Sequence, residues 1–201
     1  QMKALYRENK REFFILLVTF AITLLLGVQQ GLLVGVALSI AMVIYNTANP
    51  HMTELGSIED GRLFRNTTRF ENARVRDDVL IFRFDAPLYF ANKDFFIERL
   101  YQWIKNRTGG TLSSVVFDAE AVASIDSTAI LALQQVIENL KNQNIKFYIS
   151  NAIGPVRDTI KNSSLCDYLD ERLMFSTIHD AITYIDAGVN EHADAALQTN
   201  N

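Results

Sequence analysis

Residues 13–45 read FFILLVTFAITLLLGVQQGLLVGVALSIAMVIY, and no side chain in this stretch is charged. A single helix of this length would measure about 50 Å at about 1.5 Å per residue, whereas a bilayer core is only about 30 Å thick. Gly27 and Gly31 enclose two polar glutamines near the middle of the stretch. We therefore predict a two-helix transmembrane hairpin over residues 13–46 that is broken between Gly27 and Gly31.

Each arm of this hairpin is short. Residues 13–26 and 32–45 would each reach about 21 Å as helices, so we expect other membrane helices to shield the tip. Residues 1–12 are rich in basic side chains, which favour the cytoplasmic side, and we predict a short juxtamembrane helix there. A hairpin returns the chain to the side on which it entered. Everything after Asn46 is therefore expected in the cytoplasm, attached to the inner or plasma membrane of the cell.

The first residue is Gln1, not methionine, and we expect the sequence to be part of a longer protein. A secretory signal peptide is excluded as an explanation of the apolar stretch, because the stretch is far too long and no small-residue cleavage site follows.

The second half of the chain alternates between strand-like and helix-like segments, which favours an α/β domain with a mixed, largely parallel sheet and flanking helices. We assign this domain to residues 79–187, the connector and first strands to residues 47–78, and a disordered tail to residues 188–201. β-branched and aromatic runs predict strands at 79–84, 88–90, 115–117 and 145–149, near Phe175, and at 62–65 in the connector. Apolar periodicity predicts helices at 93–107, 127–142, 154–162 and 178–185. In the connector, Gly56 and Gly61 are interpreted as turn residues.

Composition narrows the functional classes. The formal net charge of −4 does not suit a nucleic-acid surface. Cys166 is the single cysteine, and the three histidines are scattered without metal-ligand spacing. We find no phosphate-binding loop, dinucleotide fingerprint or nucleophile elbow. The sequence therefore indicates no enzyme, no catalytic residue, no metal and no cofactor.

One loop, residues 118–129, combines polar residues with a strand-to-helix junction. Asp126 is suited to be the helix N-cap, and Ser127 and Thr128 then lie in the first turn. A helix N-terminus favours anions, so a phosphate on either hydroxyl would be stabilised there, although Asp126 would repel it. The alternative is ordinary capping without modification. The carboxylates of Asp118, Glu120 and Asp126, without a histidine, are a weak signal for a metal or acid–base site. Asp118 is therefore interpreted as a turn or capping residue of this anion-site loop.

At several positions the sequence resembles the SulP-type anion permeases. The resemblance to their last two membrane segments lies in residues 20–24, 27–31 and 35–39. The resemblance to the connector that leads into their cytoplasmic STAS domain lies in residues 50–56. The resemblance to the STAS signature lies in residues 88–92, in Asp118 and in the run from Ile125 to Ala129. The similarity extends over about residues 10–187.

The resemblance implies a secondary active transporter of sulfate, bicarbonate or a related anion, with the substrate site on helices outside this sequence. It implies homodimers, association with the rest of the membrane domain, and a STAS domain that regulates transport and docks cytoplasmic proteins. In related anti-sigma factor antagonists, the phosphorylated hydroxyl lies two positions after the motif aspartate, which corresponds to Thr128. Ala129 replaces the glycine that is common in those antagonists. The competing interpretation is a stand-alone, membrane-tethered STAS signalling protein.

Overall fold

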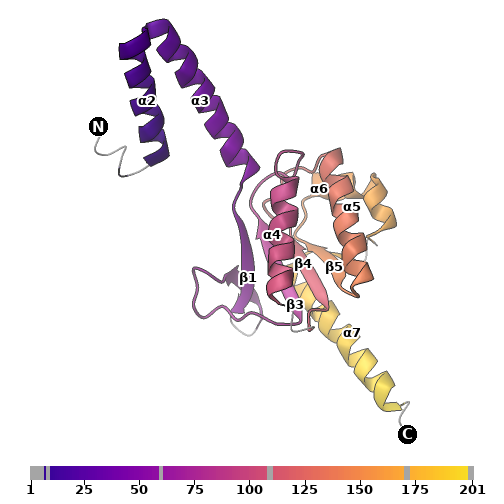
Figure 1. The fold of residues 1–201 in the computed structure, drawn as a ribbon. Coiled ribbons are helices and arrows are strands. Elements are labelled where there is room, and N and C mark those ends of the chain that lie inside the picture. The colour runs from indigo at the N-terminus through magenta and orange to yellow at the C-terminus, as the bar shows by residue number, and fades with distance from the viewer. Residues whose placement is uncertain (1–6, 8–9, 59–60, 108–110, 170–172, 199–201) are drawn as a thin grey trace. The chain divides into compact units, whose positions relative to one another are not determined.

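The computed structural model describes residues 7, 10–58, 61–107, 111–169 and 173–198. The chain forms two compact units, Gln1–Asn49 and Pro50–Asn201. The first is a pair of helices and the second an α/β domain (Figure 1). Most of the basic helix predicted over residues 1–12 lies outside the described residues.

The first unit is the predicted helical hairpin. Helix α2 (Lys10–Leu26) and helix α3 (Val28–Ala48) are joined by Gly27 alone, whose φ of 102° suits glycine. The guanidinium of Arg11 lies 5.2 Å from the ring centroid of Tyr45. The start of α2 is therefore beside the end of α3, so the two arms are antiparallel.

The prediction that the break extends to Gly31 was wrong. Gly31 lies in the first turns of α3 and is buried. A Cβ atom at Gly31 would be 1.9 Å from Thr23 Oγ1, and one at Gly35 would be 2.9 Å from Thr19 Cγ2. These glycines allow the two helix backbones to approach closely, as small residues do in membrane helix pairs.

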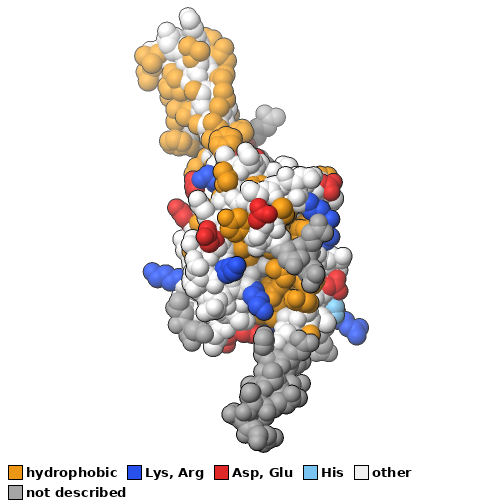
Figure 2. Space-filling view, turned by 90° about the vertical axis from the view of Figure 1, so that its right-hand side faces the viewer, with side chains coloured by type: hydrophobic (Ala, Val, Ile, Leu, Met, Phe, Trp, Pro, Cys, Tyr) orange, Lys and Arg blue, Asp and Glu red, His pale blue; other side chains and the backbone are white. Residues whose placement is uncertain are grey.

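The hairpin exposes a large apolar surface. Leu25 is 81% exposed, Val28 is 75% exposed and Leu24 is 70% exposed, and Figure 2 shows hydrophobic side chains covering this unit. Among the described residues, α3 is the one helix long and apolar enough to span a membrane. Helix α2 has 17 residues and begins with three charged ones.

The second unit is built on a six-stranded sheet of order β2-β1-β3-β4-β5-β6. Strands β3 to β6 are parallel, and β1 is antiparallel to both β2 and β3. The strands are β1 (Met52–Ile58), β2 (Leu63–Asn66), β3 (Val79–Phe84), β4 (Ser114–Asp118), β5 (Lys146–Ser150) and β6 (Met174–Phe175). The helices are α4 (Lys93–Asn106), α5 (Ser127–Asn142), α6 (Gly154–Lys161), the 3₁₀ turn η1 (Ser164–Asp167) and α7 (Ile178–Gln198). The predicted α/β class with a largely parallel sheet is confirmed.

Each face of the sheet has its own hydrophobic cluster. Val115 and Phe117 of β4 belong to the cluster that includes residues of α4, α5 and α6. Val116 belongs to the cluster that includes Ile178 and Ala181 of α7. Because strand side chains alternate between faces, Asp118 lies on the α7 face.

The structure also differs from the sequence-based expectations at Gly56, at residues 88–90 and in α7. Gly56 is not a turn residue but part of β1, where a Cβ would be 2.9 Å from Arg74 O. Residues 88–90 do not form a strand, since only Leu88 makes a bridge, to Ile125. Helix α7 continues to Gln198, where a disordered tail was expected, because residues 189–198 contain neither glycine nor proline to end it.

Candidate functional site

The N-terminus of α5 is organised by Asp126. Its Oδ1 accepts hydrogen bonds from Ala129 N at 2.8 Å and from Thr128 Oγ1 at 2.7 Å. Its Oδ2 accepts one from Phe90 N at 2.9 Å. Asp126 is thus the N-cap of α5 and also attaches the loop after β3 to this helix.

The loop after β3 is fixed by further backbone and side-chain bonds. Leu88 N donates to Ser124 O at 3.0 Å, and Asp126 N donates to Leu88 O at 3.1 Å. Asn92 is fully buried, and its Nδ2 donates to Pro87 O at 2.8 Å. No structural role was predicted for Asn92 from the sequence. The one local indication was its position directly before the predicted helix at 93–107.

These hydrogen bonds determine the ionisation of Asp126. Desolvation opposes its charged form, but the bonds from Ala129 N, Thr128 and Phe90 N outweigh desolvation. The pKa of the Asp126 carboxyl therefore lies below its ordinary value.

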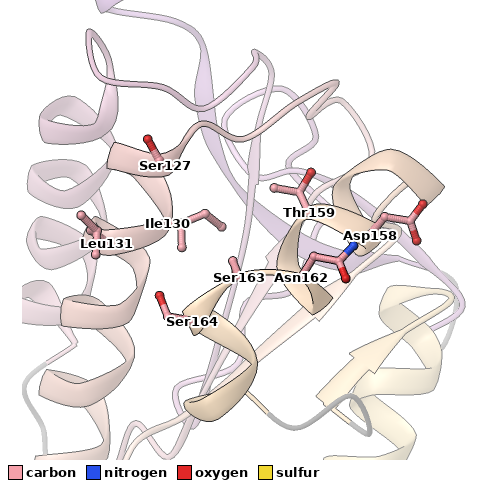
Figure 3. Close-up of a pocket in the computed structure, with 8 residues that line it drawn as sticks. All are labelled: Ser127, Ile130, Leu131, Asp158, Thr159, Asn162, Ser163 and Ser164. Atoms are coloured by element: carbon pink, nitrogen blue, oxygen red, sulfur yellow. The ribbon is translucent and has the colours of Figure 1, made fainter.

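Ser127 and Thr128 are both exposed in the first turn of α5. The Thr128 hydroxyl donates to the Asp126 carboxylate, whereas Ser127 lines a groove between α5 and the α6–η1 segment (Figure 3). The groove has a volume of about 630 Å³, and Ile130 and Leu131 contribute its apolar side. Gln134 Nε2 donates to Ser164 Oγ at 2.5 Å and links α5 to η1. The junction therefore presents two accessible hydroxyls, one already bound to a carboxylate.

Asp118 does not join this site, because it lies on the α7 face of the sheet. It is 2% exposed and accepts a hydrogen bond from Asn151 Nδ2 at 2.9 Å. Burial raises the pKa of the Asp118 carboxyl above its ordinary value. Asn151 has a φ of 54°, a left-handed conformation that asparagine tolerates. Asp118 faces a second hollow, whose other lining residues include Arg83 and His179.

Within the part of the chain that the structure describes, no three histidine, cysteine, aspartate or glutamate side chains are grouped to hold a metal ion. Asp118, Glu120 and Asp126 therefore form no joint cluster.

Comparison with models of protein families matches residues 72–181, more than half of the chain, to the STAS domain. The chain belongs to the STAS domain family. The α5 junction and Asp118 both fall inside the matched part of this STAS domain.

Relatives of this STAS protein include Sulfate transporter 4.1, chloroplastic, of Arabidopsis thaliana, which is 33% identical over 186 residues. The match covers 89% of this chain and 27% of that protein. The human Sulfate transporter is 27% identical over 218 residues, covering 91% of this chain and 30% of the human protein. The predicted resemblance to SulP-type permeases is confirmed.

The fold is similar to that of the murine Solute Carrier 26 family member A9 anion transporter in the inward-facing state. The TM-score is 0.79 at 25% identity, and the match covers 92% of this chain and 30% of the murine chain. The STAS protein thus spans less than a third of the length of these relatives.

Proposed function

We propose that this chain is part of a secondary active transporter of sulfate, bicarbonate or a related anion. The supporting observation is that the similarity to sulfate transporters extends over 89% of the chain, and so over hairpin and STAS domain together. A hairpin that exposes so much apolar surface also suits a membrane better than water. In this proposal α2 and α3 are membrane helices packed against the rest of the membrane domain.

The substrate site is assigned to membrane helices other than α2 and α3, and no substrate-binding residue is assigned to this chain. The STAS domain is a cytoplasmic module for regulation, docking and homodimer assembly at the inner or plasma membrane. It is not an enzyme in this proposal, in agreement with relatives that are named as transporters.

Anion uptake tests the proposal directly. The protein encoded by the complete reading frame is expressed in cells deficient in sulfate uptake, and radiolabelled sulfate entry is measured with unlabelled bicarbonate, chloride and dicarboxylates as competitors. We expect saturable uptake that one of these anions inhibits. A protein that reaches the membrane but transports none of them contradicts the proposal.

We propose Thr128 as the regulatory phosphoacceptor, with Ser127 as the second candidate. Its support is the exposure of Thr128 in the first turn of α5, where backbone N–H groups favour an anion. A phosphate would displace the Thr128–Asp126 hydrogen bond and place two negative groups side by side. Phosphorylation is therefore expected to loosen the cap and the attached Phe90 segment.

Phosphopeptide mapping and uptake assays of Thr128→Ala and Thr128→Glu test this role, and Ser127→Ala tests the second candidate in the same way. We expect a phosphopeptide that contains Thr128, and transport rates that differ between the Ala and Glu variants. Equal transport in both variants, with no phosphate on Thr128, rules out the role.

A further inference from the structure

A row of polar side chains crosses the α7 face of the sheet near the carboxyl ends of the parallel strands. Arg83 of β3 is in register with Thr53 of β1 and with Asp118 of β4. Asp118 is also in register with Ser150 of β5. Thr53, Asp118 and Ser150 are all buried. Ligands of open α/β sheets bind outside the carboxyl ends of the strands, so this row lies where a binding site is expected.

The middle of this row lines the second hollow, which has a volume of about 660 Å³. The charged and titratable residues of the hollow are separated by sign along the sheet. They are Arg62, Arg65 and Arg83 on the side of β2 and β3, Asp118 and Glu120 at and after the end of β4, and His179 and Asp180 in the first turn of α7. His179 Nδ1 contacts Gly61 O at 3.1 Å. Three arginines and three carboxylates therefore line the hollow from different sides.

Arg83 and Asp118 are neighbours of opposite charge that do not pair with each other, although adjacent strands are only about 4.8 Å apart. Arg83 Nε lies 2.8 Å from Asp85 Oδ1 as an ion pair, but without hydrogen-bond geometry. Asp118 Oδ1 accepts hydrogen bonds from Asn151 Nδ2 at 2.9 Å and from Glu120 N at 3.4 Å. Among the described residues, no basic side chain is within ion-pair distance of Asp118. The second carboxylate oxygen of Asp118 is thus left for a ligand.

We propose that the space between Arg83 and Asp118 binds a free α-amino acid. The ammonium group of the amino acid donates to Asp118 Oδ2, and its carboxylate lies against the guanidinium of Arg83. Both groups of an α-amino acid are attached to one carbon, which suits two side chains on adjacent strands. Arg65 supplies a second cation on the carboxylate side of the hollow.

The arrangement of charge favours a zwitterion over a simple ion. An anion alone would meet the buried carboxylate of Asp118, and a cation alone would meet the arginines. Burial raises the pKa of the Asp118 carboxyl, so its charged form is costly in the empty hollow. A bound ammonium group offsets this cost. Ionisable groups perturbed in this way are common at functional sites.

The rest of the hollow sets a preference for the side chain of the amino acid. Leu63 and Phe64 of β2, together with Ile178 of α7, contribute apolar lining. Apolar surface that these residues remove from water adds to the affinity. We therefore expect leucine, methionine and phenylalanine to bind more tightly than glycine.

This binding site goes beyond the proposed transport function and does not depend on it. All the residues that line the hollow belong to the α/β unit. Binding can therefore be measured whatever anion the protein carries, and a failure of one proposal leaves the other intact.

Isothermal titration calorimetry of the full protein in lipid nanodiscs tests the proposal with L-leucine, L-methionine and L-phenylalanine as probes. We expect saturable binding of one molecule per chain for at least one of them. The N-acetylated form of that amino acid lacks the ammonium group, and its amide lacks the carboxylate. Each is expected to bind about tenfold more weakly or worse, because a hydrogen bond to a charged group is lost. No binding of any probe, or equal binding of the three forms, overturns the proposal.

Variants of the two central residues complete the test. Asp118→Asn and Arg83→Gln are each expected to weaken binding about tenfold or more. Thermal melts of Asp118→Asn separate lost binding from lost folding, because this variant keeps the acceptor for Asn151 Nδ2. Arg69→Gln is the matched control, since Arg69 is exposed and does not line the hollow. Unchanged affinity in both central variants, or an equal loss in Arg69→Gln, overturns the proposal.

Discussion

At the scale of single residues, Asp118 and Asp126 show how position decides the behaviour of identical side chains. Asp126 at a helix start receives three hydrogen bonds that favour its charge. Asp118 at a strand end is almost fully buried and has one strong donor, Asn151. The pKa of Asp126 is therefore lowered, whereas the pKa of Asp118 is raised.

Replacing Asp126 by alanine removes the N-cap, and we expect a loss of about 1 kcal/mol in the free energy of unfolding. Because the folded-state pKa is lowered, the ionic part of this contribution is present above the ordinary carboxylate pKa. It is lost as the pH falls through the folded-state value. Urea unfolding at about pH 7 and about pH 3 measures both effects, with Asp126→Asn as the control. A deficit that is equal at both pH values contradicts this account.

Replacing Asp118 by asparagine is expected to raise the melting temperature at neutral pH. A raised folded-state pKa means that ionisation costs stability as the pH rises through that value. Asparagine removes this cost and keeps an oxygen that accepts from Asn151 Nδ2. Thermal melts between about pH 4 and pH 8 check the prediction, because the advantage shrinks in acid. Asp118→Leu, which lacks the acceptor, is expected to be less stable than Asp118→Asn.

At the scale of elements, three glycines show which structural features the sequence could predict and which it could not. Gly27, Gly31 and Gly56 look alike in a sequence. Only Gly27 breaks a helix, whereas Gly31 and Gly56 leave space for a neighbouring backbone or side chain. Such packing depends on contacts distant in sequence, and for that reason β1 and the true extent of the hairpin break were missed. Helix α5 and strand β3 were predicted correctly, because local periodicity and capping define them.

Gly31→Leu is expected to separate the arms of the hairpin, since even a Cβ would be 1.9 Å from Thr23 Oγ1. Cysteines introduced at Arg11 and Tyr45, which are in contact in the native hairpin, report the separation. Disulfide formation between them is expected to slow at least tenfold, which corresponds to about 1.4 kcal/mol. Ala37→Leu, on an exposed position of α3, is the matched control. Equal cross-linking rates in both variants contradict close packing at Gly31.

At the scale of the whole molecule, the α/β unit contains complete hydrophobic clusters on both faces of its sheet. Arg76 adds a bridge between the end of the connector and α7, because it pairs with both Asp78 and Asp186. The fold class was accessible from the sequence, as alternating strands and helices imply it. The separation of Asp118 from Asp126 could not be predicted from the sequence, because the register of the sheet decides on which face of a strand a side chain lies.

Residues 50–201 alone are therefore expected to fold and to unfold in one cooperative transition. Calorimetry checks this, and the calorimetric enthalpy should equal the van't Hoff enthalpy. Arg76→Ala should keep the single transition at a lower midpoint temperature. Two separate transitions in the unaltered domain would mean that the two clusters are independent.

The strand order has a consequence for synthesis. The cluster on the α7 face includes Leu55 at one end of the chain and Ile185 near the other. Between their translation lie roughly 7–26 seconds at about 5–20 residues per second. Throughout that interval the face of β1 that carries Leu55 lacks its partner residues on α7. The nascent chain is thus expected to depend on a chaperone until α7 emerges.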